Sequence, residues 1–126
     1  MQILRVLIVE DHHDSADSLA RLVRLAGHEV EVAYSGHIGL LMAERRPPDV
    51  VLLDIGLPRL DGYRIAEELR SCDQTKDALI IAVTGYSNSD DIQRSKEAGF
   101  DLHLVKPIST EELLSVMRKR GSRVKP

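Results

Sequence analysis

The chain has 126 residues, of which 43% are apolar, enough to build one domain around a buried core. With 17 basic and 20 acidic side chains the formal net charge is −3, which excludes a general attraction to nucleic acid or to an anionic membrane. The single cysteine, Cys72, excludes an intramolecular disulfide and fits a reducing cytoplasm. No apolar run approaches the roughly 20 residues of a membrane span, and the first residues lack the basic start of an export signal, so we expect a cytoplasmic location.

Five short apolar runs recur along the chain, and helical patterns separate them. The runs are residues 4–9, 30–34, 50–53, 79–83 and 102–105. Strands that alternate with helices predict a parallel sheet covered on both faces. Residues 6–9, 50–53 and 79–83 are apolar throughout, as central strands are. The second and fifth alternate with polar residues, at least in part, which indicates edge strands.

The segments between these runs carry apolar residues at helical spacing. The predicted inward-facing stripes are Ala16, Leu19, Ala20, Val23 and Ala26; Ile38, Leu41 and Met42; Ile65, Ala66 and Leu69; and Leu113, Leu114 and Met117. Gly27 is expected to end the first helix, and Ser109 or Thr110 with Glu112 to begin the last. The helix expected at 89–98 has few large apolar side chains beyond Ile92, so we expect it to pack least firmly.

Five such units, joined by right-handed crossovers, favour a doubly wound α/β fold with the strand order 2-1-3-4-5. We expect one domain over residues 1–120 and a frayed basic tail over 121–126. This order places the first and third strands side by side at a switch point. Ligands of such folds bind there, beyond the carboxyl ends of the strands.

Polar residues follow four of the predicted strands. Glu10 and Asp11 follow the first, Asp54 the third, Thr84 the fourth and Lys106 the fifth. Because the carboxyl ends of parallel strands share one edge of the sheet, we expect these side chains to converge. Three neighbouring carboxylates repel one another, and a divalent cation relieves that repulsion. Hard oxygen ligands select Mg²⁺ or Mn²⁺, whereas the five histidines lack the spacing of a zinc site.

This edge of the sheet is suited to phosphate chemistry. Magnesium in proteins is bound by one or two carboxylates together with phosphate oxygens. Lys106 supplies a positive charge for the same phosphate, and Thr84 supplies a hydroxyl donor. A carboxylate nucleophile, a metal and a lysine are the groups that phosphoryl transfer needs, so the sequence predicts that chemistry here.

Taken together, these residues resemble the receiver domains of bacterial response regulators. The match runs from Arg5 to about Arg118. It comprises Glu10-Asp11, Asp54 in Val51-Leu52-Leu53-Asp54-Ile55, Leu57-Pro58, Asp61-Gly62-Tyr63, Thr84-Gly85-Tyr86 and Lys106-Pro107. Each motif alone is weak, but the full set in this order is specific. The resemblance implies the doubly wound receiver fold and a phosphorylation-dependent switch of a two-component signalling system.

The resemblance also implies roles around the phosphoryl group. Asp54 is the expected phosphoacceptor, Lys106 is expected to contact the phosphate, with a cis bond to Pro107, and Thr84 is expected to move toward the new group. The position three before the lysine is usually aromatic and couples to this threonine, but here it is His103. At this position we favour an exposed edge-strand histidine over a pH sensor.

For the metal, the resemblance implies four protein ligands. Asp11 is expected to bind Mg²⁺ directly and Glu10 mainly through a water molecule. Asp54 and the backbone carbonyl of Gly56 complete the set. The carbonyl needs no particular side chain, so the sequence itself gives no signal for it.

The function predicted in this way is a signalling switch and not an enzyme with a separate substrate. The chain would assist its own phosphorylation and dephosphorylation. The expected donor is a histidine kinase or a histidine phosphotransfer protein, and the expected target is a downstream protein or a fused output domain. No basic stripe or recognition helix indicates direct contact with nucleic acid, no membrane partner is expected, and we expect a monomer or a weak dimer.

Two alternatives stay open at the level of sequence. One is a receiver-like docking module that no longer switches, an idea that His103 keeps open. The other is a small phosphatase with an aspartyl nucleophile, which Gly56 disfavours because such sites usually place a second carboxylate at that position. The sequence fits a chain that acts alone and equally a piece of a hybrid kinase or of a longer regulator.

Overall fold

Strands and helices alternate along the chain. The computed structural model describes residues 3–55, 62–85 and 89–123. The strands are β1 (Arg5–Val9), β2 (Glu29–Ala33), β3 (Val50–Asp54), β4 (Leu79–Thr84) and β5 (Leu102–Val105). The helices are α1 (His13–Leu25), α2 (Gly36–Arg45), α3 (Gly62–Ser71), α4 (Ser89–Ala98) and α5 (Thr110–Arg123). Each predicted strand is therefore present, with its ends within one residue of the predicted ones.

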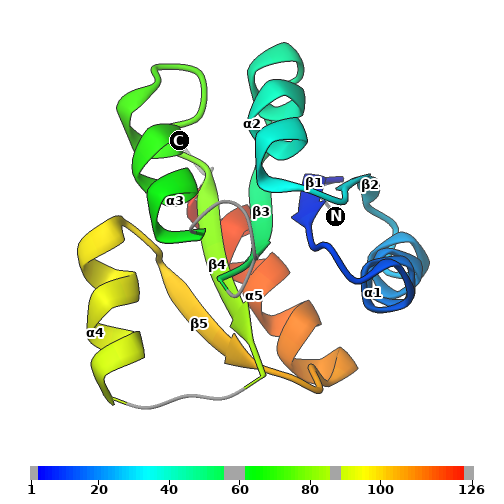
Figure 1. The fold of residues 1–126 in the computed structure, drawn as a ribbon. Coiled ribbons are helices and arrows are strands. Elements are labelled where there is room, and N and C mark those ends of the chain that lie inside the picture. Colours follow the sequence, from blue (N-terminus) through cyan, green and yellow to red (C-terminus); the bar gives the residue numbers. More distant parts are fainter. Residues whose placement is uncertain (1–2, 56–61, 86–88, 124–126) are drawn as a thin grey trace.

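The five strands form one parallel sheet in the order β2-β1-β3-β4-β5, so the predicted order and the predicted edge strands are confirmed (Figure 1). In the register, Val9 of β1 pairs with Leu53 of β3. Asp54 pairs with Val83 of β4, and Thr84 pairs with Val105 of β5. The carboxyl ends of the four strands that carry the predicted site are thus level with one another.

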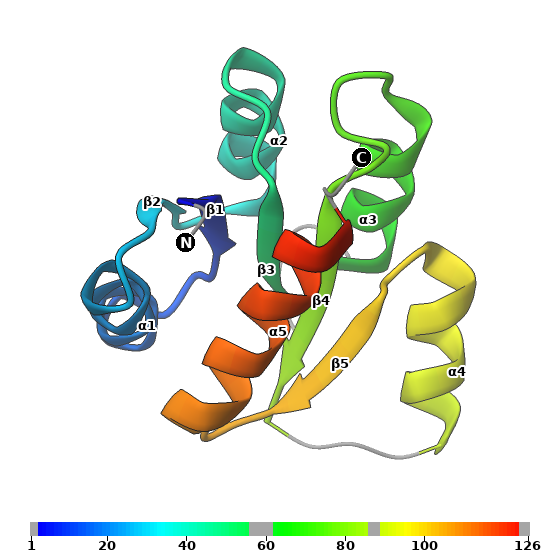
Figure 2. The same ribbon diagram turned by 180° about the vertical axis from the view of Figure 1, so that it is seen from behind.

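The sheet separates two cores, because successive residues of a strand point to opposite faces. On one face, Leu7, Val51 and Ile80 pack with residues of α2 and α3. On the other face, Ile8, Leu52 and Ile81 pack with residues of α1 and α5. Figure 2 shows α5 lying across the sheet on the side opposite α3. The apolar residues of the three central strands are buried on both faces of the sheet, as predicted.

The inward face of α2 differs from the predicted one. Ile38 and Leu41 are 45% and 44% exposed, so the expected stripe of Ile38, Leu41 and Met42 is wrong for its first two members. Gly36, Gly39 and Ala43 are buried instead, with Met42 partly buried beside them. A Cβ at position 39 would lie 2.8 Å from Val9 Cγ2, so the helix approaches β1 more closely than larger residues would allow. The pattern of large apolar residues cannot reveal a face made of small ones.

The predicted cap at the start of α5 is present at Ser109. Ser109 Oγ accepts a hydrogen bond from the Glu112 N–H at 3.0 Å, and Glu112 Oε1 accepts one from the Ser109 N–H at 3.3 Å. This reciprocal pair satisfies two backbone donors of the first turn. The helix continues to Arg123, past the expected domain end at residue 120, and residues 124–126 lie outside the described residues.

Two aspartates fix the amino ends of the strands. Asp49, just before β3, accepts a hydrogen bond from the Arg5 N–H at 2.8 Å through its carboxylate. Asp101, just before β5, accepts one from the Ile80 N–H at 2.9 Å in the same way. The backbone N–H groups of both aspartates donate back, to the carbonyls of Arg5 and Ile80, at 2.8 Å. Each aspartate therefore locks the start of one strand against its neighbour.

Within the described part of the chain, none of the helices is long and apolar enough to cross a membrane. Cys72 is partly exposed just beyond the end of α3.

Candidate functional site

The strand register assembles the predicted site at the carboxyl edge of the sheet. Glu10 follows Val9, whose partner Leu53 precedes Asp54, so the two acids lie beside each other on adjacent strands. Carboxylate oxygens of Glu10, Asp11 and Asp54 all lie within 4.8 Å of one another. The three acids predicted from three positions of the sequence therefore meet at one point.

The three carboxylates differ in their exposure to water. Glu10 is only 5% exposed, the Asp54 side chain is 15% exposed, and Asp11 is exposed. Glu10 Oε2 accepts a hydrogen bond from the His12 N–H at 3.2 Å, at the start of α1. The cluster thus has a buried member, a half-buried member and one that faces solvent.

Lys106 reaches the same cluster from the end of β5. Its ammonium donates to Glu10 Oε1 in a short hydrogen bond and lies 3.3 Å from Asp54 Oδ2. The Lys106 N–H also donates to the Thr84 carbonyl at 2.7 Å, which ties the end of β5 to the end of β4. The peptide bond between Lys106 and Pro107 is cis, as predicted. The bond from Lys106 to Glu10 was not predicted, since the lysine was expected to serve a phosphate.

The electrostatics of the cluster follow from this crowding. Burial raises the pKa of the Glu10 carboxyl, and the neighbouring Asp54 raises it further, against the lowering effect of Lys106. Burial alone would lower the pKa of Lys106, but its bonds to Glu10 and Asp54 outweigh that effect and the pKa is raised. One lysine therefore compensates a group of three acids only in part.

The chemistry of these donors fits a hard divalent cation. Three carboxylates within reach of one point offer oxygen ligands alone, which favours Mg²⁺ or Mn²⁺ over softer metals. The predicted fourth ligand, the carbonyl of Gly56, lies outside the described residues. So do Leu57, Pro58, Asp61 and Tyr86 of the sequence motifs.

A cavity of about 540 Å³ adjoins the cluster, between α1 and the start of α5. Its lining combines the charged groups of the cluster with polar and apolar residues of α1 and the sheet, among them Glu10, Asp14, Ser15, Ser18, Leu19, Leu22, Asp54 and Lys106. The carboxylate of Asp54 is therefore accessible from this side to a small reactant.

Gly62 brings the start of α3 against the end of β3. A Cβ at this position would lie 2.7 Å from Ile55 Cα and 3.1 Å from the Asp54 carbonyl oxygen. The role of Gly62 is to allow the helix to approach the backbone that carries Asp54.

Thr84 and His103 lie on neighbouring strands beyond the acid cluster. Thr84 is buried at 4% exposure at the end of β4. His103 is half-buried, so the favoured interpretation of an exposed edge-strand residue is wrong. Its Nδ1 lies 3.4 Å from Ser95 Oγ, and Ser95 is a buried residue of α4. The histidine is therefore covered by the helix that packs on β5.

Ser95 is a residue of this region that the sequence did not single out. It belongs to the spaced series Ile92, Ser95 and Ala98, in which Ser95 and Ala98 are buried and Ile92 is partly buried. The spacing is helical, but a serine in a polar helix gives no apolar signal. Tyr63 is buried, with its ring edge-on to Phe100 and the Arg94 guanidinium 4.1 Å above it.

Comparison with protein families agrees with this geometry. The family model of the response regulator receiver domain matches residues 6–118. The matched range contains every strand and helix of the fold except the last turn of α5 and the first residue of β1.

Curated relatives are longer than this chain. The transcriptional regulatory protein PrrA of Mycobacterium tuberculosis is 39% identical over 122 residues, which are 94% of this chain and 52% of that protein. The dual master transcriptional regulator RpaA of Synechocystis, named as DNA-binding, is 31% identical over 114 residues, or 90% of this chain and 47% of that one. The chain thus spans about half the length of the relatives it matches.

Solved structures of similar length share the whole fold. The chemotaxis protein CheY4 of Vibrio cholerae has a TM-score of 0.89 and 28% identity, covering 94% of this chain and 98% of that one. The receiver domain of the sensor histidine kinase PA1611 of Pseudomonas aeruginosa has a TM-score of 0.87 and 29% identity, covering 95% and 99%. That structure is described with a magnesium ion coordinated in its active site cleft.

Proposed function

The chain belongs to the response regulator receiver domain family of two-component systems, and from that premise we propose that it is a phosphorylation-dependent switch with Asp54 as the phosphoacceptor. The observation that carries the proposal is the convergence of Glu10, Asp11 and Asp54 beside the ammonium of Lys106. Crowded acids with one shared cation make poor structural contacts but a suitable receiver for a metal and a phosphoryl group.

In the proposed reaction, an Asp54 carboxylate oxygen forms a bond to phosphorus as the phosphorus–nitrogen bond of a phosphohistidine breaks. The bonding electron pair leaves on the ring nitrogen, and the ring, protonated at its other nitrogen, departs as neutral imidazole. Lys106, which is 3.3 Å from Asp54, is placed to neutralise charge on the phosphoryl oxygens. Thr84 offers a hydroxyl for one of those oxygens.

We assign the metal to Glu10, Asp11 and Asp54, with the carbonyl of Gly56 as a further ligand. Mg²⁺, when bound, supplies positive charge that offsets the repulsion between the carboxylates and the incoming phosphate. Asp11 is the exposed member of the cluster and offers its carboxylate directly, whereas the buried Glu10 is held by Lys106 and acts mainly through water. Any hydrolysis of the aspartyl phosphate resets the switch without a separate substrate.

The response passes from Thr84 toward His103 and α4 in this proposal. Movement of Thr84 at the end of β4 alters the space beside β5, where His103 contacts Ser95 of α4. The partner-binding surface that changes is therefore α4, β5 and α5. A donor histidine kinase or phosphotransfer protein, a single domain over residues 1–120 and a cytoplasmic location complete the proposal.

We further infer that the output lies outside the described domain. Relatives of about twice this length are named as transcriptional and DNA-binding regulators, so a fused output domain or a separate downstream protein would read the switch. The receiver itself needs no contact with nucleic acid for this role.

Labelling with a small acyl phosphate tests the proposal. With Mg²⁺ present, the protein should gain the mass of one phosphoryl group, and peptide mapping should place it on Asp54. Asp54→Asn should gain none, and chelation of the metal should abolish labelling of the wild type. Asp73→Asn is the matched control, because Asp73 is a 95% exposed acid that belongs neither to the cluster nor to the lining of the cavity, and it should label normally.

The two alternative functions give different results in the same assay. A docking module would stay unlabelled while it still binds its partner, with Asp54→Asn binding as the wild type does. A phosphatase would turn over phosphate esters many times per chain. Either result would overturn the switch.

A further inference from the structure

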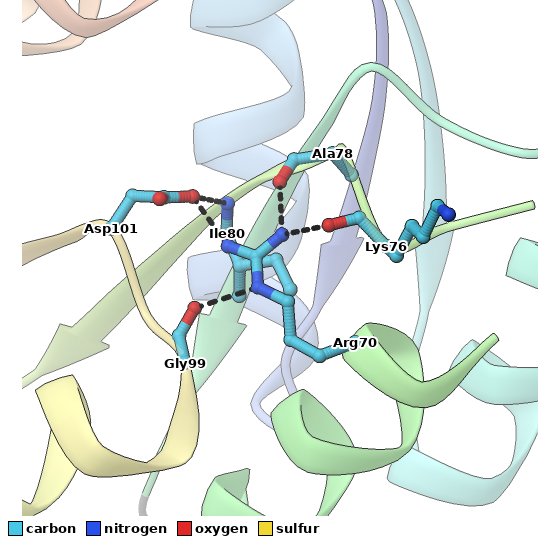
Figure 3. A network of polar contacts seen from close by, with 6 residues as sticks. All are labelled: Arg70, Lys76, Ala78, Ile80, Gly99 and Asp101. Carbon is cyan, nitrogen blue, oxygen red and sulfur yellow. Dashed lines mark hydrogen bonds and ion pairs between the residues drawn. The ribbon is translucent and has the colours of Figure 1, made fainter. Parts of the chain in front are cut away.

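A guanidinium at the end of α3 joins the connection between α3 and β4 to the segment between α4 and β5 (Figure 3). Arg70 Nη1 donates to the carbonyls of Lys76 and Ala78, at 2.7 and 2.6 Å, in the connection between α3 and β4. Its Nε donates to the Gly99 carbonyl at 2.9 Å, just after α4. Its Nη2 forms an ion pair with Asp101 Oδ2 at 2.6 Å, just before β5. The planar fork of arginine suits such a set of fixed acceptors, and lysine could not replace it.

The same contacts bind the far end of α4 to the sheet. Asp101 Oδ2, which receives Arg70, also accepts the Ile80 N–H at 2.9 Å, so the ion pair joins the start of β4. Gly99 has a φ of +104°, and a Cβ there would lie 2.8 Å from Arg70 Cγ, so the arginine stem packs directly on this residue. The next residue, Phe100, is 6% exposed in the core.

The side chains of α4 are described from Ile92 onward. In the described part of this helix, the buried side chains are Ser95 and Ala98, whereas Ile92 is partly buried and Gln93 is exposed. The contact of Arg94 with the Tyr63 ring is also in the second half of the helix. Figure 1 shows the beginning of α4 on the side of the molecule where β4 ends, and its end beside the start of β5. Among residues 92–98, whose side chains the structure describes, the buried side chains and the contact with Tyr63 thus lie in the half of the helix nearest Arg70.

We propose that Arg70, through Gly99 and Asp101, is the fixed anchor about which α4 pivots when the site is phosphorylated. The inference rests on the proposed switch and specifies how it is regulated. A change at the end of β4 acts on the beginning of α4, and the clamped end converts it into a tilt of the helix instead of a displacement of the whole helix. Arg70 makes no described contact with the acid cluster, so it is a positioning residue and not a catalytic one.

Amide hydrogen exchange followed residue by residue tests the anchor. The protein is compared with and without Mg²⁺ and beryllofluoride, a stable mimic of the phosphoryl group, for the wild type, Arg70→Gln and Arg64→Gln. Arg64 is the matched control, because it lies on the same helix, is 71% exposed and pairs only weakly with Glu68 at 3.7 Å. Each protein is also labelled with an acyl phosphate to check Asp54 chemistry.

In the wild type and in Arg64→Gln, the mimic should change exchange mainly in residues 89–93 and leave the amides of Ile80 and Asp101 unchanged. In Arg70→Gln, the mimic should speed exchange of those two amides by at least about tenfold, because the clamped end then moves with the helix. Labelling of Asp54 should stay within about twofold of the wild type, since none of the contacts described for Arg70 involves the acid cluster. A purely structural arginine would instead raise exchange equally with and without the mimic.

Identical responses of Arg70→Gln and the wild type would overturn the anchor, and so would a wild-type response centred on residues 96–101. If Arg70→Gln fails to fold, Asp101→Asn removes the ion pair while its amide oxygen can still accept the Ile80 N–H, and the same spread is expected. A wild type that Mg²⁺ and an acyl phosphate leave unlabelled overturns the switch and the anchor together. Labelling with an unaltered exchange pattern in the variant overturns the anchor alone.

Discussion

At the amino end of the sheet, Asp49 and Asp101 each have hydrogen-bond partners of their own. At the carboxyl end, Glu10 and Asp54 share Lys106, and Asp11 lies close to both acids. Asp49 and Asp101 each accept a backbone N–H and so fix the strand register. The acids at the other end fix little and repel one another. Charge at the amino end stabilises the fold, whereas charge at the carboxyl end is suited to bind a cation and a phosphoryl group.

The same kind of mutation should change the free energy of unfolding in opposite directions at the two ends of the sheet. Removing an acid from the amino end should leave donors without acceptors and lower the free energy of unfolding. Removing one from the carboxyl end should relieve repulsion and raise it. Such a trade of stability against function is typical of sites whose polar groups are incompletely compensated.

The largest effect on stability is expected for Asp101→Ala. The mutation removes the partner of Arg70, whose side chain is 23% exposed, and the acceptor of the Ile80 N–H. Losing a charge-assisted pair and a partly buried acceptor should lower the free energy of unfolding by about 2 to 3 kcal/mol. Urea unfolding followed by circular dichroism measures it.

Asp73→Ala is the control for this measurement, because Asp73 is 95% exposed and 3.8 Å from Lys76. It should unfold within about 0.5 kcal/mol of the wild type. A loss as small for Asp101→Ala would remove the distinction between the two ends of the sheet.

Much of this arrangement could be predicted from sequence, and the reason is the regularity of a parallel sheet. Apolar runs indicate the strands, and the residue after each run lies at the edge that the strands share. The sequence alone therefore predicts that Glu10, Asp54 and Lys106 lie close together. The face of α2 was missed because Gly39 and Ala43 carry no large apolar signal.

The partners of long polar side chains could not be predicted in the same way. Arg70 looks like an ordinary basic residue in the last turn of a helix, and its acceptors are mostly backbone carbonyls that leave no trace in the sequence. The bond between Lys106 and Glu10 spans 96 positions and depends on rotamers at the end of two strands. The burial of His103 depends on how α4 covers β5. The sequence of α4 is mostly polar, so it does not show which face of the helix packs on the strand.

Replacing an aspartate by asparagine should have opposite effects on stability at the two ends of the sheet. Without Mg²⁺, Asp54→Asn should raise the free energy of unfolding by about 1 kcal/mol, because one of three crowded negative charges disappears while Lys106 keeps Glu10. Asp49→Asn should lower it by about 0.5 to 1 kcal/mol, because a neutral oxygen accepts the Arg5 N–H less strongly than a carboxylate does.

Mg²⁺ should stabilise the two variants to different extents. Millimolar Mg²⁺ should stabilise the wild type and Asp49→Asn to a similar extent, and should have a smaller effect on Asp54→Asn, which lacks one ligand charge. Urea midpoints of the three proteins, measured with and without Mg²⁺, give the stabilisation of each. Destabilisation by Asp54→Asn in metal-free buffer would mean that Lys106 fully compensates the acids, and the contrast between the two ends would be lost.

The smallest expected effect concerns His28, which accepts the Leu4 N–H through Nδ1 at 3.0 Å just before β1. Burial lowers the pKa of His28, so the neutral ring is favoured in the folded protein. The folded state then binds a proton less readily than the unfolded state. The stability from this group is complete above the ordinary imidazole pKa near 6.5 and is lost as the pH falls through the lower pKa of the folded protein.

Urea unfolding at pH 7.5 and pH 5.5 should show a loss of a few tenths of a kcal/mol in the free energy of unfolding of the wild type. His28→Gln, whose side chain is neutral at both pH values, should not show this loss. His37→Gln, at an exposed position of α2, should keep the wild-type dependence. An equal loss in His28→Gln would mean that the neutral imidazole contributes nothing to the amino end of the sheet.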